Sequence, residues 1–168
     1  MFKKIIITIF ITIIIFLTYT INSNNKTNVI NTNIKSKNGI IRYINKPIIG
    51  KLTIDKINLN KYLYDKNSKY NNIEYNIEII QENKNLLVLA AHSGYGSVAF
   101  FNNLDKLKIN DLINLTYYNN KSTYKIINIY EEEKNGYINI PKRNTKQLIL
   151  TTCSKNKHKQ LIIECLIQ

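Results

Sequence analysis

The C-terminal stretch constrains the fold most, because it reads as two strands joined by a short loop. Residues 148–152 form the apolar and β-branched run Leu-Ile-Leu-Thr-Thr, which favours a strand. A polar loop follows over residues 154–159, and a second apolar run occupies residues 160–167. The pattern predicts an antiparallel hairpin, and its register decides which side chains share a face of the sheet.

The predicted hairpin separates the two cysteines of the chain. With residues 154–159 as its loop, Leu148 lies opposite Cys165 and Cys153 lies opposite Gln160. The two sulfurs are then about 16 Å apart along the ladder, at about 3.3 Å per residue, which is beyond disulfide reach. We therefore expect Cys165 to pack in the core and Cys153, at the end of its strand, to be a free thiol.

A second apolar strand also ends at a chemically active residue. Residues 86–91 are apolar on both faces, as in an interior strand, and His92 follows directly before a Ser-Gly-Tyr-Gly loop. We expect the sheet to deliver His92 and Cys153 to one site. A second interpretation stays open, in which Cys153 is a half-buried structural residue and His92 an unrelated loop residue.

Short apolar runs and turn signals continue through residues 47–168. The expected strands are two short pieces within 51–59 and further strands at 61–65, 86–91, 111–118, 122–130, 137–140, 147–153 and 160–167. Residues 70–81 and 100–107 have helical spacing, and residues 131–136 read as a charged turn. The prediction is an all-β fold: a closed or nearly closed antiparallel barrel of about eight strands with one or two short helices.

The N-terminus has the pattern of a membrane anchor. Two lysines precede the uncharged stretch Ile5–Ile21, which as a helix is about 25 Å long and can cross a thin bilayer. A cleaved signal peptide is the competing interpretation, but no Ala or Gly precedes Gly39 to form a cleavage site. The lysines place the N-terminus in the cytoplasm and the rest outside the cell. The predicted organisation is a cytoplasmic tip and transmembrane anchor (1–21), an extracellular spacer rich in Asn, Thr, Lys and Ser (22–46), and a folded domain (47–168).

The formal net charge of +13, from 24 Lys and Arg against 11 Asp and Glu, raises the question of a nucleic-acid partner. The basic residues are scattered, and abundant Ile, Asn, Lys and Tyr indicate a bias toward A/T-rich codons. Arginine, the better phosphate ligand, occurs only at Arg42 and Arg143. We expect no nucleic-acid partner. We also expect no cofactor or metal, because an isolated acidic triplet such as Glu131–Glu133 is more typical of a solvated turn than of a calcium site.

A thiol and an imidazole at one site can catalyse acyl transfer. A thiolate at Cys153 attacks a carbonyl carbon, and His92 protonates the leaving amine. The oxyanion needs hydrogen-bond donors or a cation, which Thr152 and the stretch 157–160 can supply. The thioester on Cys153 is then resolved by water or, in a transpeptidase, by an amine.

Several segments of the chain resemble one family. They are Ile49–Ile57, Ala91-His92-Ser93, Phe101-Asn102-Asn103-Leu104 and Leu150-Thr151-Thr152-Cys153. Together with the anchor and spacer, they resemble the sortases, the surface transpeptidases of Gram-positive bacteria, over about residues 48–168. The resemblance implies a nucleophile at Cys153 and an acid/base at His92. It also implies cleavage of a sorting signal of the Leu-Pro-x-Thr-Gly kind after its Thr, and transfer to an amine of a cell-wall precursor or a pilin lysine.

The chain departs from the family at one position. Sortases carry an arginine at the start of the last strand, and Gln160 stands there in this sequence, so Gln160 is the expected third catalytic residue. Glutamine donates hydrogen bonds but lacks the charge. Lys159 is adjacent, but a shift of one residue turns a side chain to the opposite face. Lys157 and Arg143 are further candidates from loops. The predicted substrate contacts are Thr152, Ser93, Gly94 and Lys159.

Two other functions stay open at this point. The chain could be a non-catalytic or degraded sortase-like domain that binds peptides at the cell surface, or a cysteine peptidase that uses water as the acceptor. The connection 131–146 has no room for a long helix, which argues against a class B arrangement and toward the housekeeping or class D/E-like forms, and leaves the class undecided.

Overall fold

The structure is a computed structural model that describes residues 32–35, 41–44 and 47–168, in two separate units. The first unit holds an antiparallel pair of strands, β1 (Thr32–Lys35) and β2 (Ile41–Ile44). These strands fall in the predicted spacer, where we expected little regular structure. Their Thr, Ile and Tyr residues favour strands.

The predicted anchor, Ile5–Ile21, lies outside the described residues. Among the residues that are described, no helix has the length and apolar character needed to cross a membrane.

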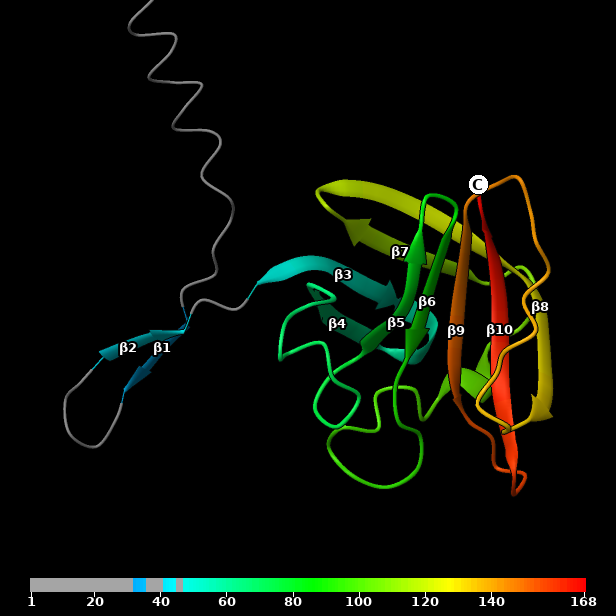
Figure 1. Cartoon of the computed structure of the whole chain (residues 1–168), viewed down its shortest axis with the longest axis horizontal. Coiled ribbons are helices and arrows are strands. Elements are labelled where there is room, and N and C mark those ends of the chain that lie inside the picture. Colours follow the sequence, from blue (N-terminus) through cyan, green and yellow to red (C-terminus); the bar gives the residue numbers. More distant parts are fainter. Residues whose placement is uncertain (1–31, 36–40, 45–46) are drawn as a thin grey trace, which may run out of the picture. The chain divides into compact units, whose positions relative to one another are not determined.

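The second unit is an eight-stranded sheet with two 3₁₀ helices. Its strands are β3 (Ile48–Ile54), β4 (Leu59–Tyr64), β5 (Glu78–Asn83), β6 (Leu86–Ala90), β7 (Leu112–Tyr117), β8 (Asn120–Glu133), β9 (Gln147–Cys153) and β10 (Lys159–Ile167). The helices are η1 (Asp55–Ile57) and η2 (Leu104–Lys106). The strand order is β4-β3-β7-β8-β10-β9-β6-β5 (Figure 1). The edge strands β4 and β5 contact each other without a hydrogen-bonded ladder, so the predicted all-β, nearly closed barrel is confirmed.

One strand pair departs from the predicted antiparallel pattern. β6 and β9 run parallel, whereas the other neighbouring pairs of this sheet are antiparallel. The reason is topological. The short loop of the hairpin fixes β10 along one edge of β9. In sequence, β7 and β8 lie between β6 and β9, and this long connection returns the chain so that β9 pairs with β6 in the same direction.

The barrel core forms where alternate residues of these strands point inward. Leu87, Leu89, Leu148, Leu150 and Cys165 belong to this core, together with Phe101. A smaller apolar cluster of Val88, Ile149 and Ile162 lies on the opposite, outer face of the sheet. Because β6, β9 and β10 are apolar on both faces, they behave as interior strands, as expected for residues 86–91.

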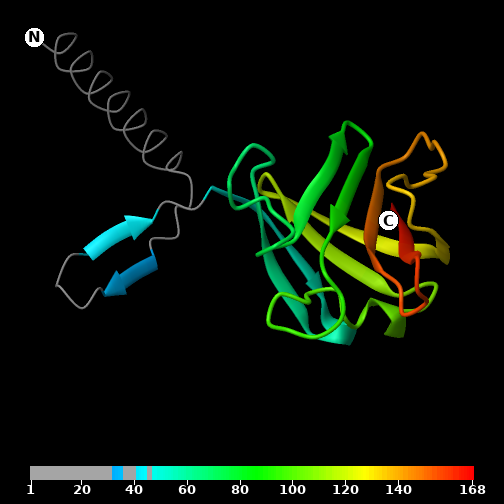
Figure 2. The same cartoon turned by 60° about the horizontal axis from the view of Figure 1, so that its bottom comes forward.

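A segment of the β8–β9 connection covers that outer cluster. Ile138 and Ile140 pack against it, and in Figure 2 the connection runs along the outside of β9 and β10. The prediction of a strand at 137–140 is wrong: the segment pairs with no strand in a ladder, and a Glu132 carboxylate oxygen accepts the Asn139 N–H at 3.3 Å. The predicted charged turn is also wrong for Glu131–Glu133, which are the last residues of β8.

The helical spacing of residues 70–81 gives turns and then β5. The side chain of Asn71 accepts the Ile79 N–H at 2.7 Å, and Asn72 accepts the Glu74 N–H at 2.9 Å. Asparagine side chains that bind the backbone in this way compete with helix formation. Residues 100–107 form turns and the short helix η2, in agreement with the expected short helical or 3₁₀ segment.

Smaller differences concern β4 and one hairpin. Residues 59–64 form one strand rather than parts of two. The loop between β7 and β8 is Tyr118-Asn119, both with positive φ, one residue before the predicted position.

Gly50 has a packing role, since a Cβ there would lie 2.5 Å from the Thr116 carbonyl oxygen of β7.

Candidate active site

The β9–β10 ladder has the register that the sequence predicts. Cys153 lies opposite Gln160, and Leu148 lies opposite Cys165. Both cysteines are free thiols, and Cys153 is exposed whereas Cys165 is fully buried. Burial raises the pKa of the Cys165 thiol. Cys153 is therefore the thiol that can meet a substrate.

The parallel pair β6–β9 brings His92 to Cys153. Ala90 of β6 lies opposite Thr151 of β9, so extending the register by two residues places His92 beside Cys153. Two hydrogen bonds hold the strand ends together. The Thr152 hydroxyl donates to the Ala91 carbonyl oxygen at 2.7 Å, and the Ser93 hydroxyl donates to the Cys153 carbonyl oxygen at 2.7 Å.

The loop after His92 is tied to the turn that follows it. The Phe101 N–H donates to the His92 carbonyl oxygen at 3.0 Å, and the Gly94 N–H donates to the Asn102 side-chain oxygen at 3.1 Å. Gly94 and Gly96 have φ of 110° and 123°, a region that favours glycine. The two segments noted in the sequence, around His92 and Phe101, thus form one local unit.

A hollow of about 620 Å³ lies on the outer face of the sheet beside Cys153. Its apolar walls include Ile80, Val88, Ile138 and Ile140. Its polar end holds Cys153, His92, Gln160 and Lys134. The structure therefore brings both predicted catalytic partners of Cys153 into one hollow.

A second hollow, of about 650 Å³, lies on the other side of Cys153. Its lining includes Ser93, Gly94, Asn102, Asp105, Lys106, Glu131 and Lys155. Thr152 and Cys153 line both hollows, so the thiol stands at the boundary between them. Three of the four predicted substrate contacts, Ser93, Gly94 and Thr152, line this hollow, and Lys159 does not.

Hydrogen bonds and ion pairs order the walls of the second hollow. Ser154 and Asn156 donate to the Glu131 carboxylate and hold its pKa below the usual range, with a further contribution from Lys159. Lys155 pairs with Asp105. Two carboxylates and two lysines, Lys106 and Lys155, thus line the hollow beside the thiol.

Gln160 shares a face with Cys153, but its amide has other partners. Its Nε2 donates to the Tyr137 carbonyl oxygen at 2.6 Å and to Glu132 Oε1 at 3.3 Å. Lys159 lies opposite Glu133 on the other face of β10 and lines neither hollow. The Thr152 hydroxyl already donates its hydrogen bond to the Ala91 carbonyl oxygen.

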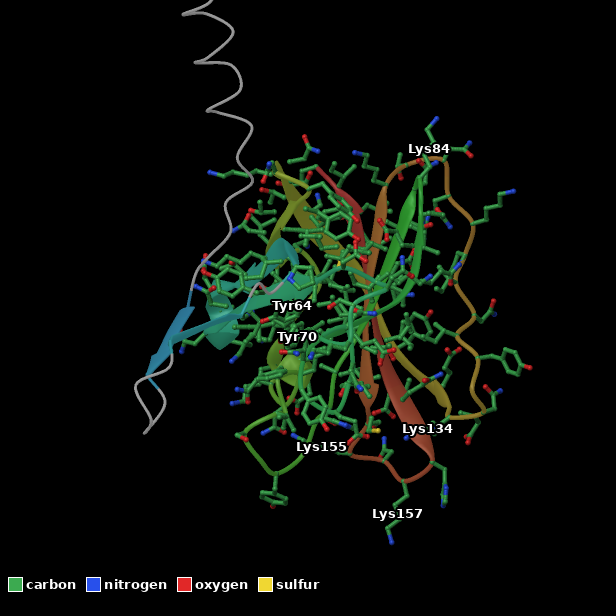
Figure 3. All side chains as sticks on the ribbon, turned by 60° about the vertical axis from the view of Figure 1, so that its left-hand side comes forward. Tyr64, Tyr70, Lys84, Lys134, Lys155 and Lys157 are labelled. Atoms are coloured by element: carbon green, nitrogen blue, oxygen red, sulfur yellow. The ribbon has the colours of Figure 1, made fainter. Side chains whose placement is uncertain are left out.

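The sequence did not single out Lys134, the first residue after β8. Its Nζ lies 3.2 Å from Cys153 Sγ, the only hydrogen bond that the sulfur receives within residues 47–168. Figure 3 shows Lys134, Lys155 and Lys157 at one end of the barrel and Lys84 at the opposite end. The signal for Lys134 is the β8–β10 register: Glu132 lies opposite Gln160, so residue 134 is level with His158, just before the start of β10. The interpretation of residues 131–136 as a turn hid that register.

The other basic candidates lie elsewhere. Arg143 Nε donates to the buried Glu164 carboxylate at 2.6 Å, and that ion pair raises the pKa of Arg143. Lys157 and His158 are exposed in the β9–β10 loop, where His158 has a φ of 66°. Within the described residues, no group of three His, Cys, Asp or Glu side chains is arranged to hold a metal ion.

Comparison with known families identifies one match. The sequence profile described as Sortase domain matches residues 52–167. A comparison with curated protein sequences finds no significant match.

Solved structures with the same fold include two sortase classes. A lid mutant of sortase A from Corynebacterium diphtheriae matches with a TM-score of 0.63 and 19% identity, over 74% of this chain and 72% of that one. Sortase C1 from Streptococcus agalactiae matches with a TM-score of 0.61 and 21% identity, over 74% and 69%. Sortase C from Clostridium perfringens, described with the C-terminal cell wall sorting motif, gives 0.62 and 18%, over 73% and 72%. At these identities the structures establish a common fold.

Proposed function

The chain belongs to the sortase family, and we propose that it is a cysteine transpeptidase anchored in the cell membrane with its barrel outside the cell. It cleaves a C-terminal sorting signal of the Leu-Pro-x-Thr-Gly kind and transfers the acyl group to a cell-surface amine. One observation carries the proposal: Cys153 is an exposed thiol at the boundary of two hollows, one of which also holds His92.

The acyl donor fits the first hollow. Its walls are apolar at one end, where Val88, Ile138 and Ile140 lie, and polar at the other end, where Cys153 and His92 lie. Leucine and proline side chains of a sorting signal bury well against the apolar end. The scissile bond then reaches the thiol at the polar end.

The first chemical step forms a thioester. With the thiol proton already on His92, the Cys153 thiolate attacks the carbonyl carbon of the Thr–Gly bond, a C–S bond forms, and the carbonyl electron pair moves to the oxygen. When the oxyanion collapses, the C–N bond breaks, and His92 gives its proton to the leaving glycine nitrogen.

The second step uses an amine that arrives through the second hollow. Asp105 and Glu131 line that hollow together with Lys106 and Lys155, and Lys155 pairs with Asp105, which leaves the Glu131 carboxylate to attract a cationic amine. The ammonium group loses one proton to solvent, and as the resulting amine nitrogen attacks the thioester carbon it passes a second proton to His92. A C–N bond forms, the C–S bond breaks, and the electron pair returns to the Cys153 sulfur.

The test measures acyl transfer from a fluorogenic peptide containing Leu-Pro-x-Thr-Gly to hydroxylamine, with the full chain in detergent or vesicles. We expect a peptide hydroxamate, identified by mass spectrometry. We expect Cys153→Ala to lose the rate by on the order of 10³-fold or more, because the thioester cannot form. Cys165→Ala is the matched control and keeps the rate per folded molecule.

Three outcomes contradict the proposal. Equal product from wild type and Cys153→Ala removes the nucleophile. Peptide binding without turnover indicates a surface binding domain instead. Release of free acid at saturating hydroxylamine indicates a peptidase that uses water.

A further inference from the structure

The first hollow contains one lysine and no arginine. Of the residues that line it, Lys134 alone is a lysine or arginine. The basic residues considered from the sequence are placed elsewhere: Arg143 binds Glu164, and Lys159 lies on the opposite face of β10. The charge that faces Cys153 therefore comes from the end of β8 and not from β10.

The backbone around Lys134 is held at two points. The Lys134 N–H donates to the His158 carbonyl oxygen at 2.7 Å, which ties it to the β9–β10 loop. Three residues later, the Tyr137 carbonyl oxygen accepts the Gln160 amide at 2.6 Å. Gly136, with a φ of 88°, lets the chain turn between these points. Gln160 thus anchors the loop that carries the lysine.

We propose that Lys134 is the cationic catalytic residue of this site, and that Gln160 is a positioning residue for the loop that presents it. The inference rests on the proposed transpeptidase function. Lys134 Nζ is 3.2 Å from Cys153 Sγ, so its ammonium group donates to the sulfur before the reaction. The cation of this site is thus the residue that follows β8. The glutamine at the position where the family's arginine is expected holds the loop that carries this cation.

The lysine acts on the same bonds as the nucleophile. As Cys153 Sγ forms its bond to the carbonyl carbon, negative charge leaves the sulfur and collects on the carbonyl oxygen. The side chain of lysine is flexible, so its ammonium group can shift from the sulfur to the oxyanion and donate a hydrogen bond to it. Lys134 keeps its protons throughout, and His92 supplies the proton that the leaving amine takes.

The experiment compares Lys134→Met and Lys134→Arg with Lys142→Met, an exposed lysine of the same connection that does not line this hollow. We expect Lys134→Met to lower kcat for hydroxamate formation by about 10²–10³-fold, as for loss of one oxyanion donor, with KM nearly unchanged. Lys134→Arg should recover most of that loss, and Lys142→Met should match wild type.

A second readout does not depend on turnover. Iodoacetate is an anion and iodoacetamide is neutral. A cation beside Cys153 therefore raises the alkylation rate of this thiol by iodoacetate relative to its rate with iodoacetamide. We expect Lys134→Met to lower that ratio several-fold, and Gln160→Ala to lower it less, because the loop then loses one of its two anchors. Neither change in ratio is expected of a residue that only supports the fold.

The outcomes separate the two proposals. If wild type forms no hydroxamate, the transpeptidase proposal fails. The alkylation ratio then still shows whether the Lys134 cation lies beside the Cys153 thiol. If wild type is active and Lys134→Met keeps both its kcat and its alkylation ratio, the catalytic role of Lys134 is overturned.

Discussion

The two ends of the β9–β10 ladder hold the same kind of residue in opposite environments. At one end, Cys153 lies opposite Gln160, exposed between two hollows. Toward the other end, Cys165 lies opposite Leu148 and is 0% exposed. One thiol faces the outer side of the sheet at the end of a strand, and the other faces the barrel core. Position in the sheet, rather than residue type, makes one thiol a candidate nucleophile.

The difference in exposure between the two thiols has two causes: the face of the sheet to which each side chain points, and the polar loop that follows β9. Successive side chains of a strand alternate between faces, so Cys165 joins Leu161 and Ile163 in the core. Cys153 is the last residue of β9, and beyond it the chain enters the polar loop that leads to β10. Burial raises the pKa of Cys165 and keeps it protonated and unreactive.

The largest expected effect is a difference in alkylation between the two thiols. In the native protein, iodoacetamide should modify Cys153 faster than Cys165 by about 10⁴-fold or more, because Cys165 reacts only when the barrel opens. Mass spectrometry should find one adduct in buffer and two in denaturant. Native Cys153→Ala should take up no label, and native Cys165→Ala should take up one. Rapid labelling of both thiols in the native wild type would contradict the assignment of faces.

The next comparison uses the two histidines. His92→Gln should lower kcat/KM for acyl transfer by about 10²–10⁴-fold, because the leaving amine loses its proton donor. His158→Gln is the matched control, since His158 is exposed in the β9–β10 loop and lines neither hollow. Thermal unfolding of both variants should resemble that of wild type. Equal activity of the two variants would remove His92 from the mechanism.

The C-terminal hairpin could be predicted from sequence because local pattern determines it. Two apolar runs and a short polar loop specified the register that places Cys153 opposite Gln160, and the same parity placed Cys165 in the core. The barrel class followed from the number and length of such runs. The His92 loop was found because the apolar run before it ends abruptly.

Contacts that depend on distant strands could not be predicted in this way. The parallel pairing of β6 with β9 joins segments that are about sixty residues apart in sequence, and no local signal specifies it. Lys134 was missed because it lies in a charged stretch whose acidic residues suggested a turn. Only the pairing of β8 with β10 makes that stretch a strand and brings Lys134 to Cys153.

The smallest expected effect is the pH dependence of stability that the buried thiol produces. In the unfolded chain, Cys165 ionises near the ordinary thiol value of about 8.5. In the barrel, burial raises its pKa, so above that pH the unfolded state binds fewer protons than the folded state. The free energy of unfolding therefore falls as pH rises, by at most about 1.4 kcal/mol per pH unit from this group.

Urea unfolding at a series of pH values from 8 to 10.5 can measure this contribution as a difference between proteins. We expect wild type to lose stability more steeply than Cys165→Ala and Cys165→Val. Tyr64, whose pKa is also raised by burial, contributes equally to all three proteins and cancels in the difference, whereas Tyr124, whose pKa Cys165 helps to raise, is part of the difference. Two variants are needed because the alanine leaves a cavity and the valine adds volume, which change stability by a pH-independent amount. Parallel curves for the three proteins would mean that the Cys165 thiol ionises as readily in the barrel as in the unfolded chain. The contrast between the two ends of the ladder would then lose its electrostatic basis.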